Sequence, residues 1–166
     1  DRSMTAVQMN WAGDAKAIEW LNNNVEGTPV ILEYPGKKAY SYESRVSTNT
    51  GLPTLIGWLN HEAIWRRSWV QEDEATVKIL KKAGSNIDSW SLVGARQRVA
   101  DGIYSEKDFH KIRPLLERFQ IKYIYAGKLE RNNYQPEGLA KFDKHCKKVY
   151  QDQGVTIYRV PEEYLS

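Results

Sequence analysis

The chain has 166 residues, with 24 Lys and Arg against 21 Asp and Glu for a formal net charge of +3, and this length suits one compact domain. Hydrophobic residues make up 41% of the chain and charged residues 27%, and no apolar run approaches the ~20 residues of a bilayer crossing, so no membrane-spanning segment is expected. Because acidic residues lie among the basic ones, the sequence also lacks the concentrated positive charge of a dedicated nucleic-acid binder.

The first third of the chain predicts a helix followed by two strands. Asp14 is a candidate N-cap for a helix that ends at Gly27 and Pro29. Apolar residues recur in this helix at spacings of three and four: Ile18, Leu21 and Val25. The run PVILEY, 29–34, is apolar enough for a central strand, and LPTLIGW, 52–58, predicts a second strand.

The middle of the chain predicts two helices. Residues 71–83 place Ala, Ile and Leu on one helical face, and Gly84 ends this helix. Ser105 and Asp108 resemble a capping box for an amphipathic helix that Pro114 is expected to kink or restart. The apolar face of this helix consists of Phe109, Ile112, Leu115, Leu116 and Phe119.

The last third of the chain predicts a strand, a helix and a hairpin. IKYIYAG, 121–127, has the β-branched and aromatic content of a strand, and Pro136 suits the first turn of the following helix. Residues 147–160 read as two strands joined at Gln153 and Gly154. The order of elements predicts an α/β fold: a single domain with a mixed, mainly parallel sheet, helices flanking it, and a C-terminal β-hairpin.

Ligands of such sheets sit beyond the carboxyl ends of the strands. We therefore expect the loops after Tyr34, Trp58 and Gly127 to converge on a site. His61 and Glu62 begin like a metalloprotease helix, but Trp65 stands where the second zinc-binding His would be needed, so no metal site is expected. A Ser nucleophile paired with His61 lacks the glycine elbow of hydrolases, and the alternative for His61 is a hydrogen-bonded structural role.

Arginine and tryptophan are concentrated between residues 45 and 67. Guanidinium groups suit phosphate or carboxylate ligands, and Trp rings suit sugar faces or apolar chains. The structural alternative is that Arg45 and Arg66 pair with Glu62 and Asp101 to hold long loops against the sheet, with the Trp rings in the core.

Five stretches of the sequence, between about Asp14 and Val160, resemble a known family. They are ILEYPG, SRVSTNTGLPTLIGWLNHEAIWR, RVADGIY, IKYIYAGKLERNNY and VTIYRV. In this order they are similar to the carboxyl-terminal part of the YYY-signature family of polytopic bacterial and archaeal membrane proteins, which are glycosyltransferase-like. The sequence departs from the family pattern at Lys128, where a Pro is expected, and over residues 68–95, which have diverged or been inserted.

The resemblance implies that residues 1–166 form a soluble extracytoplasmic domain of a larger cell-membrane protein, as the start at Asp1 without Met also suggests. In the glycosyltransferases that the family resembles, acidic residues of the membrane half act on lipid-linked sugars. We therefore expect an accessory or substrate-recognition domain that is not catalytic alone. Its expected partners are its own transmembrane region and a lipid-phosphate sugar or acceptor, without nucleic acid. No cofactor is expected in this domain, whereas the membrane half of the protein is allowed to hold a divalent metal.

The matched positions define the expected ligand-binding residues, and no catalytic residue is assigned. They are Arg45, Ser47, Thr50, Gly51, Trp58, His61, Glu62, Trp65, Arg66, Arg98, Asp101, Tyr104, Glu130 and Arg131.

Two other classes of function remain open from the sequence. One is a structural or interaction module of a membrane protein, and the other is a free-standing hydrolase with Glu62 or Asp101 as general base. The distinguishing feature is a solvent-open pocket shared by the charged side chains of the matched segments, namely Arg45, His61, Glu62, Arg66 and Arg98.

Overall fold

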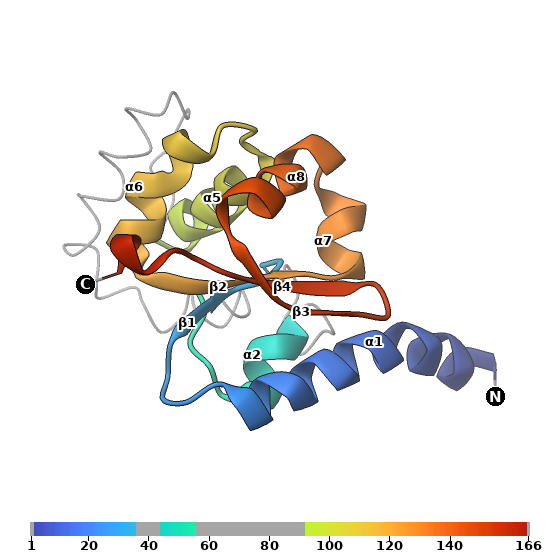
Figure 1. Ribbon diagram of the computed structural model, residues 1–166. Coiled ribbons are helices and arrows are strands. Elements are labelled where there is room, and N and C mark those ends of the chain that lie inside the picture. The colour runs from blue at the N-terminus through green and yellow to red at the C-terminus, as the bar shows by residue number, and fades with distance from the viewer. Residues whose placement is uncertain (1, 36–43, 56–91, 166) are drawn as a thin grey trace.

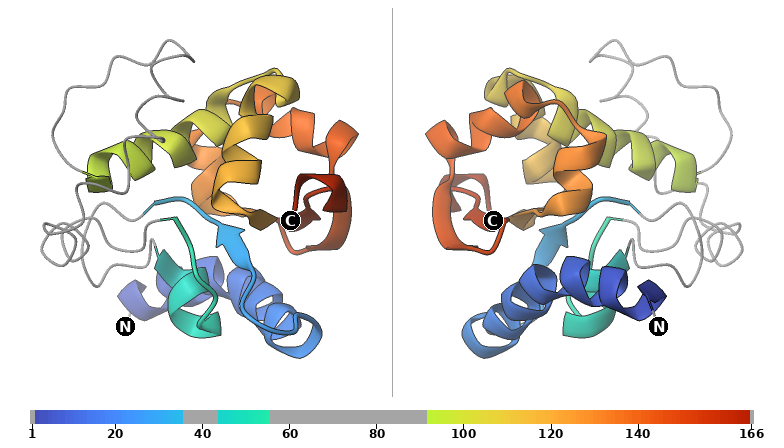
Figure 2. Two further views of the ribbon diagram at one scale, coloured as in Figure 1. Left: turned by 90° about the vertical axis from the view of Figure 1, so that its left-hand side faces the viewer. Right: turned by 90° about the vertical axis from the view of Figure 1, so that its right-hand side faces the viewer.

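The computed structural model describes residues 2–35, 44–55 and 92–165. Their elements are α1 (Arg2–Asn24), β1 (Val30–Leu32), α2 (Arg45–Thr50), α5 (Leu92–Ser105), α6 (Phe109–Phe119), β2 (Ile121–Ala126), α7 (Lys128–Asn133), α8 (Pro136–His145), β3 (Lys147–Asp152), β4 (Val155–Arg159) and the 3-10 turn η3 (Glu162–Tyr164). The sheet lies between two helical layers, with α1 and α2 on one face and α5, α6, α7 and α8 on the other (Figures 1 and 2). None of these helices is both long and apolar enough to cross a bilayer.

The four strands of the sheet lie in the order β1-β2-β4-β3. β1 pairs with β2 in parallel, whereas β2–β4 and β3–β4 are antiparallel pairs. The expected α/β fold, with a mixed sheet, flanking helices and a C-terminal hairpin, is confirmed. Only one of the three described strand pairings is parallel, so the expectation of a mainly parallel sheet overstates the parallel content. The reason is that the hairpin places β4 antiparallel to β2.

The second strand expected over residues 52–58 is wrong for its described part, since residues 52–55 form no strand. The carbonyl of Pro53 accepts a hydrogen bond from the N–H of Ile31 at 2.9 Å, which places this segment beside β1. Pro53 has no N–H, so it cannot donate in return and a ladder does not extend there. Residues 56–58 and the helix expected over 71–83 lie outside the described residues.

The helix expected to start at Asp14 instead starts at Arg2. Asp14 is therefore an interior residue of α1 and not its N-cap, and it is buried at 3% exposure. Its carboxylate accepts hydrogen bonds from Tyr125 and Arg45, which are stronger partners than backbone amides of its own helix. The end of α1 is as expected, because Gly27 follows in the left-handed region with φ of 73°.

The cap of α6 is Asp108, whose Oδ1 accepts a hydrogen bond from the N–H of His110 at 3.0 Å. Ser105 belongs to the preceding helix as the last residue of α5, so the expected capping box between Ser105 and Asp108 is wrong. Pro114 neither ends nor restarts the helix, because α6 continues through it to Phe119.

The expected strand β2, helix α8 and hairpin β3–β4 are confirmed. Gln153 and Gly154 form the hairpin turn, with φ of 45° and 78°. Two positive φ angles in succession match the type I′ turn, whose twist suits two antiparallel strands.

The core consists of one apolar cluster on each face of the sheet. Ile124 of β2 and Tyr158 of β4 face α5–α8, while Tyr125 of β2 and Ile157 of β4 face α1 and α2. Because successive side chains of a strand point to opposite faces, β2 and β4 each contribute residues to both apolar clusters. Both faces being covered explains why β2 has almost no polar residues.

Candidate functional site

The loops after β1 and β2 converge, as the sequence analysis expected for two of its three loops. Glu130, in α7 after Gly127, is fully buried. Its Oε1 accepts a hydrogen bond from the N–H of Tyr34 at 2.9 Å, and its Oε2 accepts one from the N–H of Gly127 at 2.9 Å. One carboxylate therefore joins the carboxyl ends of two parallel strands. The loop after Trp58 lies outside the described residues.

Arg45 lies at the centre of the same region and is 2% exposed. Its Nε donates to Oδ2 of Asp14 at 3.0 Å, and its Nη2 donates to Oε2 of Glu130 at 2.9 Å. Its Nη1 lies 4.0 Å from Oε1 of Glu33, and its guanidinium carbon lies 5.0 Å from the ring centre of Tyr125. We call Asp14, Glu33, Arg45 and Glu130 the Arg45 cluster.

Glu33 links the Arg45 cluster to the start of α2. Its carboxylate accepts hydrogen bonds from the backbone N–H groups of Val46 at 3.3 Å and Ser47 at 2.6 Å, which are otherwise unpaired at a helix start. Burial raises the pKa of Glu33 to about 7, against the opposing attraction of Arg45. The cluster thus combines three carboxyl groups with one guanidinium, and Glu33 is the carboxyl group whose burial favours its protonated form.

The Arg45 cluster has a large structural effect. Its members come from α1, the end of β1, α2 and α7, so it ties both helical layers to the sheet. Burial alone would lower the pKa of Arg45, but Glu130 and the other carboxylates raise it above its ordinary value, so the guanidinium stays charged. Removing one partner of such a buried group costs about 3–5 kcal/mol, because the remaining charge is left uncompensated.

Tyr104 and Asp101 of α5 take part in a second buried network. The hydroxyl of Tyr104 lies 2.6 Å from the carbonyl oxygen of Tyr125 and 3.0 Å from that of Leu32, so it bridges β1 and β2 beyond their ladder. Its ring stacks on Tyr134 at 4.6 Å between centroids, and the Tyr134 hydroxyl donates to Oδ1 of Asp101 at 2.6 Å. Burial and the Asp101 hydrogen bond raise the pKa of Tyr134 well above its ordinary range.

The remaining expected residues fall into separate places. Thr50 and Gly51 shape the end of α2: the Thr50 hydroxyl donates to Val46 O at 2.7 Å, and Gly51 adopts φ of 71°. Ser47 lies in the first turn of α2, and Arg98 is half-buried on α5. Five expected residues lie outside the described part of the chain: Trp58, His61, Glu62, Trp65 and Arg66.

Arg131 is exposed on α7 and lines an open pocket with a volume of about 330 Å³. The pocket is lined by Ala126, Arg131, Tyr134, Pro136, Leu139, Ala140, Asp143, Lys148, Gln151, Thr156 and Tyr158. Arg45 and Arg98 are not among these residues, so they do not share this pocket with Arg131. Arg131 was among the expected residues, but the polar residues of the hairpin were not, because neither β3 nor β4 shows a regular alternation of exposed and buried positions.

Within the described ranges, no three His, Cys, Asp or Glu side chains are arranged to hold a metal ion. The structural alternative for Arg45 named Glu62 and Asp101 as partners. Among the described residues, Arg45 pairs with Asp14, Glu33 and Glu130, and Asp101 accepts from Tyr134, while Glu62 and Arg66 lie outside the described part of the chain. These partners lie far away in sequence, which is why spacing alone does not identify them.

No protein-family model and no curated protein matches this chain. Among solved structures, it is similar to the C-terminal globular domain of an oligosaccharyltransferase from Archaeoglobus fulgidus, with a TM-score of 0.51 and 11% sequence identity. The similarity covers 89% of this chain and 95% of that one. At this identity the likeness concerns the fold, and membership of the YYY-signature family stays a prediction.

Proposed function

We propose that this chain is an accessory, substrate-recognising domain of a larger membrane-embedded glycosyltransferase-like protein, located on the extracytoplasmic side. The observation that carries the proposal is the fold likeness to the globular domain of an oligosaccharyltransferase over 89% of this chain and 95% of that one. The resemblance of the matched segments to a polytopic membrane-protein family supports it independently. The domain's partner is then its own transmembrane region, and its ligand is a lipid-linked sugar.

Two of the matched acidic residues are engaged inside the fold, which supports a role without catalysis. Oδ1 of Asp101 accepts a hydrogen bond from the Tyr134 hydroxyl, and Glu130 accepts from two backbone amides and from Arg45. A general base must lie within hydrogen-bond reach of the proton that it removes, whereas these two carboxylates are engaged with partners inside the fold. The matched residues of the 56–91 segment, among them His61 and Arg66, are proposed to contact the sugar phosphate.

The test uses the intact membrane protein and the 166-residue chain side by side. Transfer from lipid-linked sugars is measured with the intact protein, and the chain is titrated with a soluble polyprenyl-phosphate sugar analogue while backbone amide shifts are followed. We expect transfer by the intact protein, weak binding with a Kd on the order of 1 mM by the chain, and no turnover by the chain. His61→Ala and Arg66→Gln should weaken both transfer by the intact protein and binding by the chain. Arg118→Gln, at the end of α6, is the control and should weaken neither transfer nor binding.

Each alternative function has its own outcome in this test. Sugar-ester hydrolysis by the chain, lost in Glu62→Gln, would replace the proposal with the hydrolase. Transfer that is unchanged by His61→Ala and Arg66→Gln, together with no binding, would replace it with the structural module. The burial of Arg45, Tyr104 and Glu130 is the observation that favours the structural module as second candidate.

A further inference from the structure

The pocket beside Arg131 lies between α8 and the β3–β4 hairpin, and its two walls differ in chemistry. Along α8 the lining residues recur at spacings of three, four and seven, which places them on one face of the helix: Pro136, Leu139, Ala140 and Asp143. The hairpin wall is polar and consists of Lys148, Gln151, Thr156 and Tyr158. The volume of about 330 Å³ falls in the range of sites for small molecules.

Close packing on the opposite side of α8 explains why this space stays open. A Cβ on Gly138 would lie 2.3 Å from the carbonyl oxygen of Tyr104, so the missing side chain lets α8 rest against the end of α5. Gly138 and Ala140 are two residues apart and therefore point to different faces of the helix. Ala126 and Ala140 are small, so neither fills the gap that remains between α8 and the hairpin.

The lining charges leave one positive charge uncompensated. Lys148 Nζ lies 3.1 Å from Oδ1 of Asp143, and this oxygen also accepts from the Tyr158 hydroxyl at 2.8 Å. Arg131 pairs with no carboxylate among the described residues. Its Nη2 lies 3.5 Å from where a Cβ of Gly154 would be, so its guanidinium reaches from α7 to the hairpin turn.

We propose that this pocket binds a sugar acid, a monosaccharide carrying one carboxylate. The carboxylate pairs with the two-pronged guanidinium of Arg131. The hydroxyl groups meet Gln151, Thr156 and the Asp143–Lys148 pair, and the apolar side of the ring lies against Leu139 and Ala140 of α8. A single uncompensated cation matches a monoanion better than a phosphate dianion. The inference deepens the proposed function and rests on it for the ligand's role, with the sugar acid as part of the glycan that the parent protein handles.

The test is a titration of the ¹⁵N-labelled 166-residue chain with sodium glucuronate, followed by backbone amide shifts. For a ligand with few non-hydrogen atoms we expect a Kd on the order of 1 mM. The largest shifts should occur at Ala140, Gln151 and Thr156. Glucose, inorganic phosphate and N-acetylaspartate are titrated in parallel, as a neutral sugar, a bare anion and an acidic-peptide mimic, and each should bind at least about tenfold more weakly.

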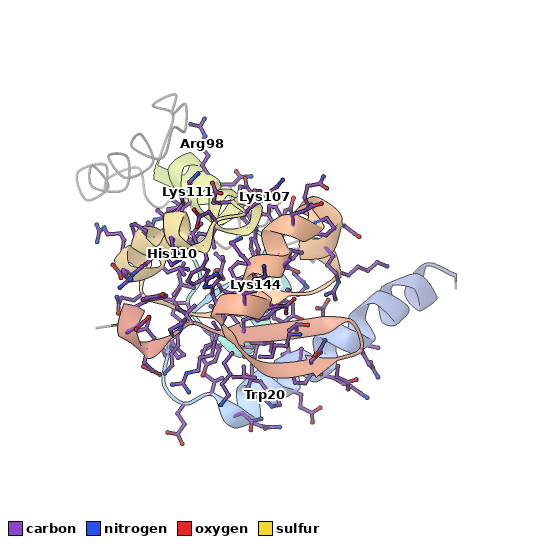
Figure 3. All side chains as sticks on the ribbon, turned by 45° about the horizontal axis from the view of Figure 1, so that its top comes forward. Trp20, Arg98, Lys107, His110, Lys111 and Lys144 are labelled. Carbon is purple, nitrogen blue, oxygen red and sulfur yellow. The ribbon has the colours of Figure 1, made fainter. Side chains whose placement is uncertain are left out.

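Variants assign the binding to the pocket. Arg131→Gln should raise the Kd for glucuronate by about tenfold or more, because it removes the charge-assisted pair. Exposed cations also lie on the outer surface of the helical layer, among them Lys107 and Lys111 (Figure 3). Lys111→Gln removes the same charge from that surface and should leave the Kd unchanged. Ala140→Leu should abolish binding by filling the pocket, while the amide spectrum of the β-sheet is retained.

Several results would overturn the inference. These are no glucuronate shifts, equal binding of glucose, phosphate or N-acetylaspartate, or equal weakening by Lys111→Gln and Arg131→Gln. Transfer by the intact protein tests the proposed function separately. Normal domain-dependent transfer without glucuronate binding would overturn this inference alone, whereas glucuronate binding that is lost in Arg131→Gln with no effect on transfer would overturn the proposed function alone.

Discussion

At the scale of single residues, the matched positions act through partners that are distant in sequence. Arg45 meets Asp14, 31 residues earlier, and Glu130, 85 residues later. Tyr104 meets the carbonyl of Leu32, 72 residues earlier. Sequence analysis singled out Arg45, Tyr104 and Glu130 through the family resemblance, but not Asp14 or Glu33. Asp14 was expected as a helix N-cap and Glu33 lies in the matched stretch ILEYPG, but only the tertiary fold pairs their carboxylates with the guanidinium.

The hydroxyl of Tyr104 should contribute measurably to stability. Tyr104→Phe removes the hydroxyl through which α5 donates to the buried carbonyl of Tyr125, so we expect a loss of about 1–3 kcal/mol in the free energy of unfolding. Tyr150→Phe is the matched control, because the buried Tyr150 hydroxyl finds no hydrogen-bond partner in the described part of the chain. That variant should be neutral or more stable. Urea unfolding of both variants makes the comparison, and equal midpoints would contradict it.

Glu33 should make the stability depend on pH. Burial raises its pKa to about 7 in the folded chain, against 4.5 as the ordinary value, so the folded state holds a proton that the unfolded state has released between these pH values. Stability from this group is therefore complete below pH 4.5 and is lost as the pH rises through 7, with a slope of up to about 1.4 kcal/mol per pH unit.

The matching experiment compares wild type with Glu33→Gln by urea unfolding from pH 4.5 to 8. The difference in unfolding free energy between the two proteins should change across this range, with the wild type losing stability relative to the variant. Parallel pH profiles would show that Glu33 titrates alike in the folded and unfolded chain.

At the scale of elements, the helices and strands with local signals were predictable. Pro136 marks the start of α8, and the Gln153–Gly154 pair marks the hairpin turn. The short helices α2 and α7 were missed. Each has six residues, too few for a stable isolated helix, and each depends on a buried glutamate, Glu33 for α2 and Glu130 for α7.

The longer helix α5 was also missed, although its sequence carries a usable signal. Its buried residues recur at spacings of three and four: Val99, Ala100, Ile103 and Tyr104. Gly94 and Gly102 lower the helix propensity of this segment, which weakens a prediction from composition. The tertiary contacts of the buried face outweigh that propensity.

Two glycines, Gly138 of α8 and Gly102 of α5, should respond to alanine substitution with changes in stability of opposite sign. Gly138→Ala should destabilise the fold by about 1–3 kcal/mol, because the new Cβ would lie 2.3 Å from the Tyr104 carbonyl oxygen and α8 would have to shift. Gly102→Ala, with nothing within 4 Å of the new Cβ, should stabilise α5 by up to about 1 kcal/mol. Thermal unfolding of both variants checks this, and a shift of the melting temperature in the same direction would count against it.

At the scale of the whole molecule, the Arg45 cluster joins segments from both ends of the chain across the sheet. The layers seen in Figures 1 and 2 meet at the carboxyl ends of β1 and β2, where this cluster is buried. The α/β class and the C-terminal hairpin followed from the order of elements. The pocket did not, because it arises from the packing of α8 against α5, which no local sequence pattern specifies.

Arg45 and Glu130 form a buried pair that holds the fold together across the sheet. The most direct measurement is a double-mutant cycle of Arg45→Met, Glu130→Gln and the double variant, followed by equilibrium urea unfolding. Each single variant should lose about 3–5 kcal/mol, and the pair should show a coupling of about 2 kcal/mol or more. Losses that add to within about 0.5 kcal/mol would contradict the claim, because the two residues would then not be energetic partners.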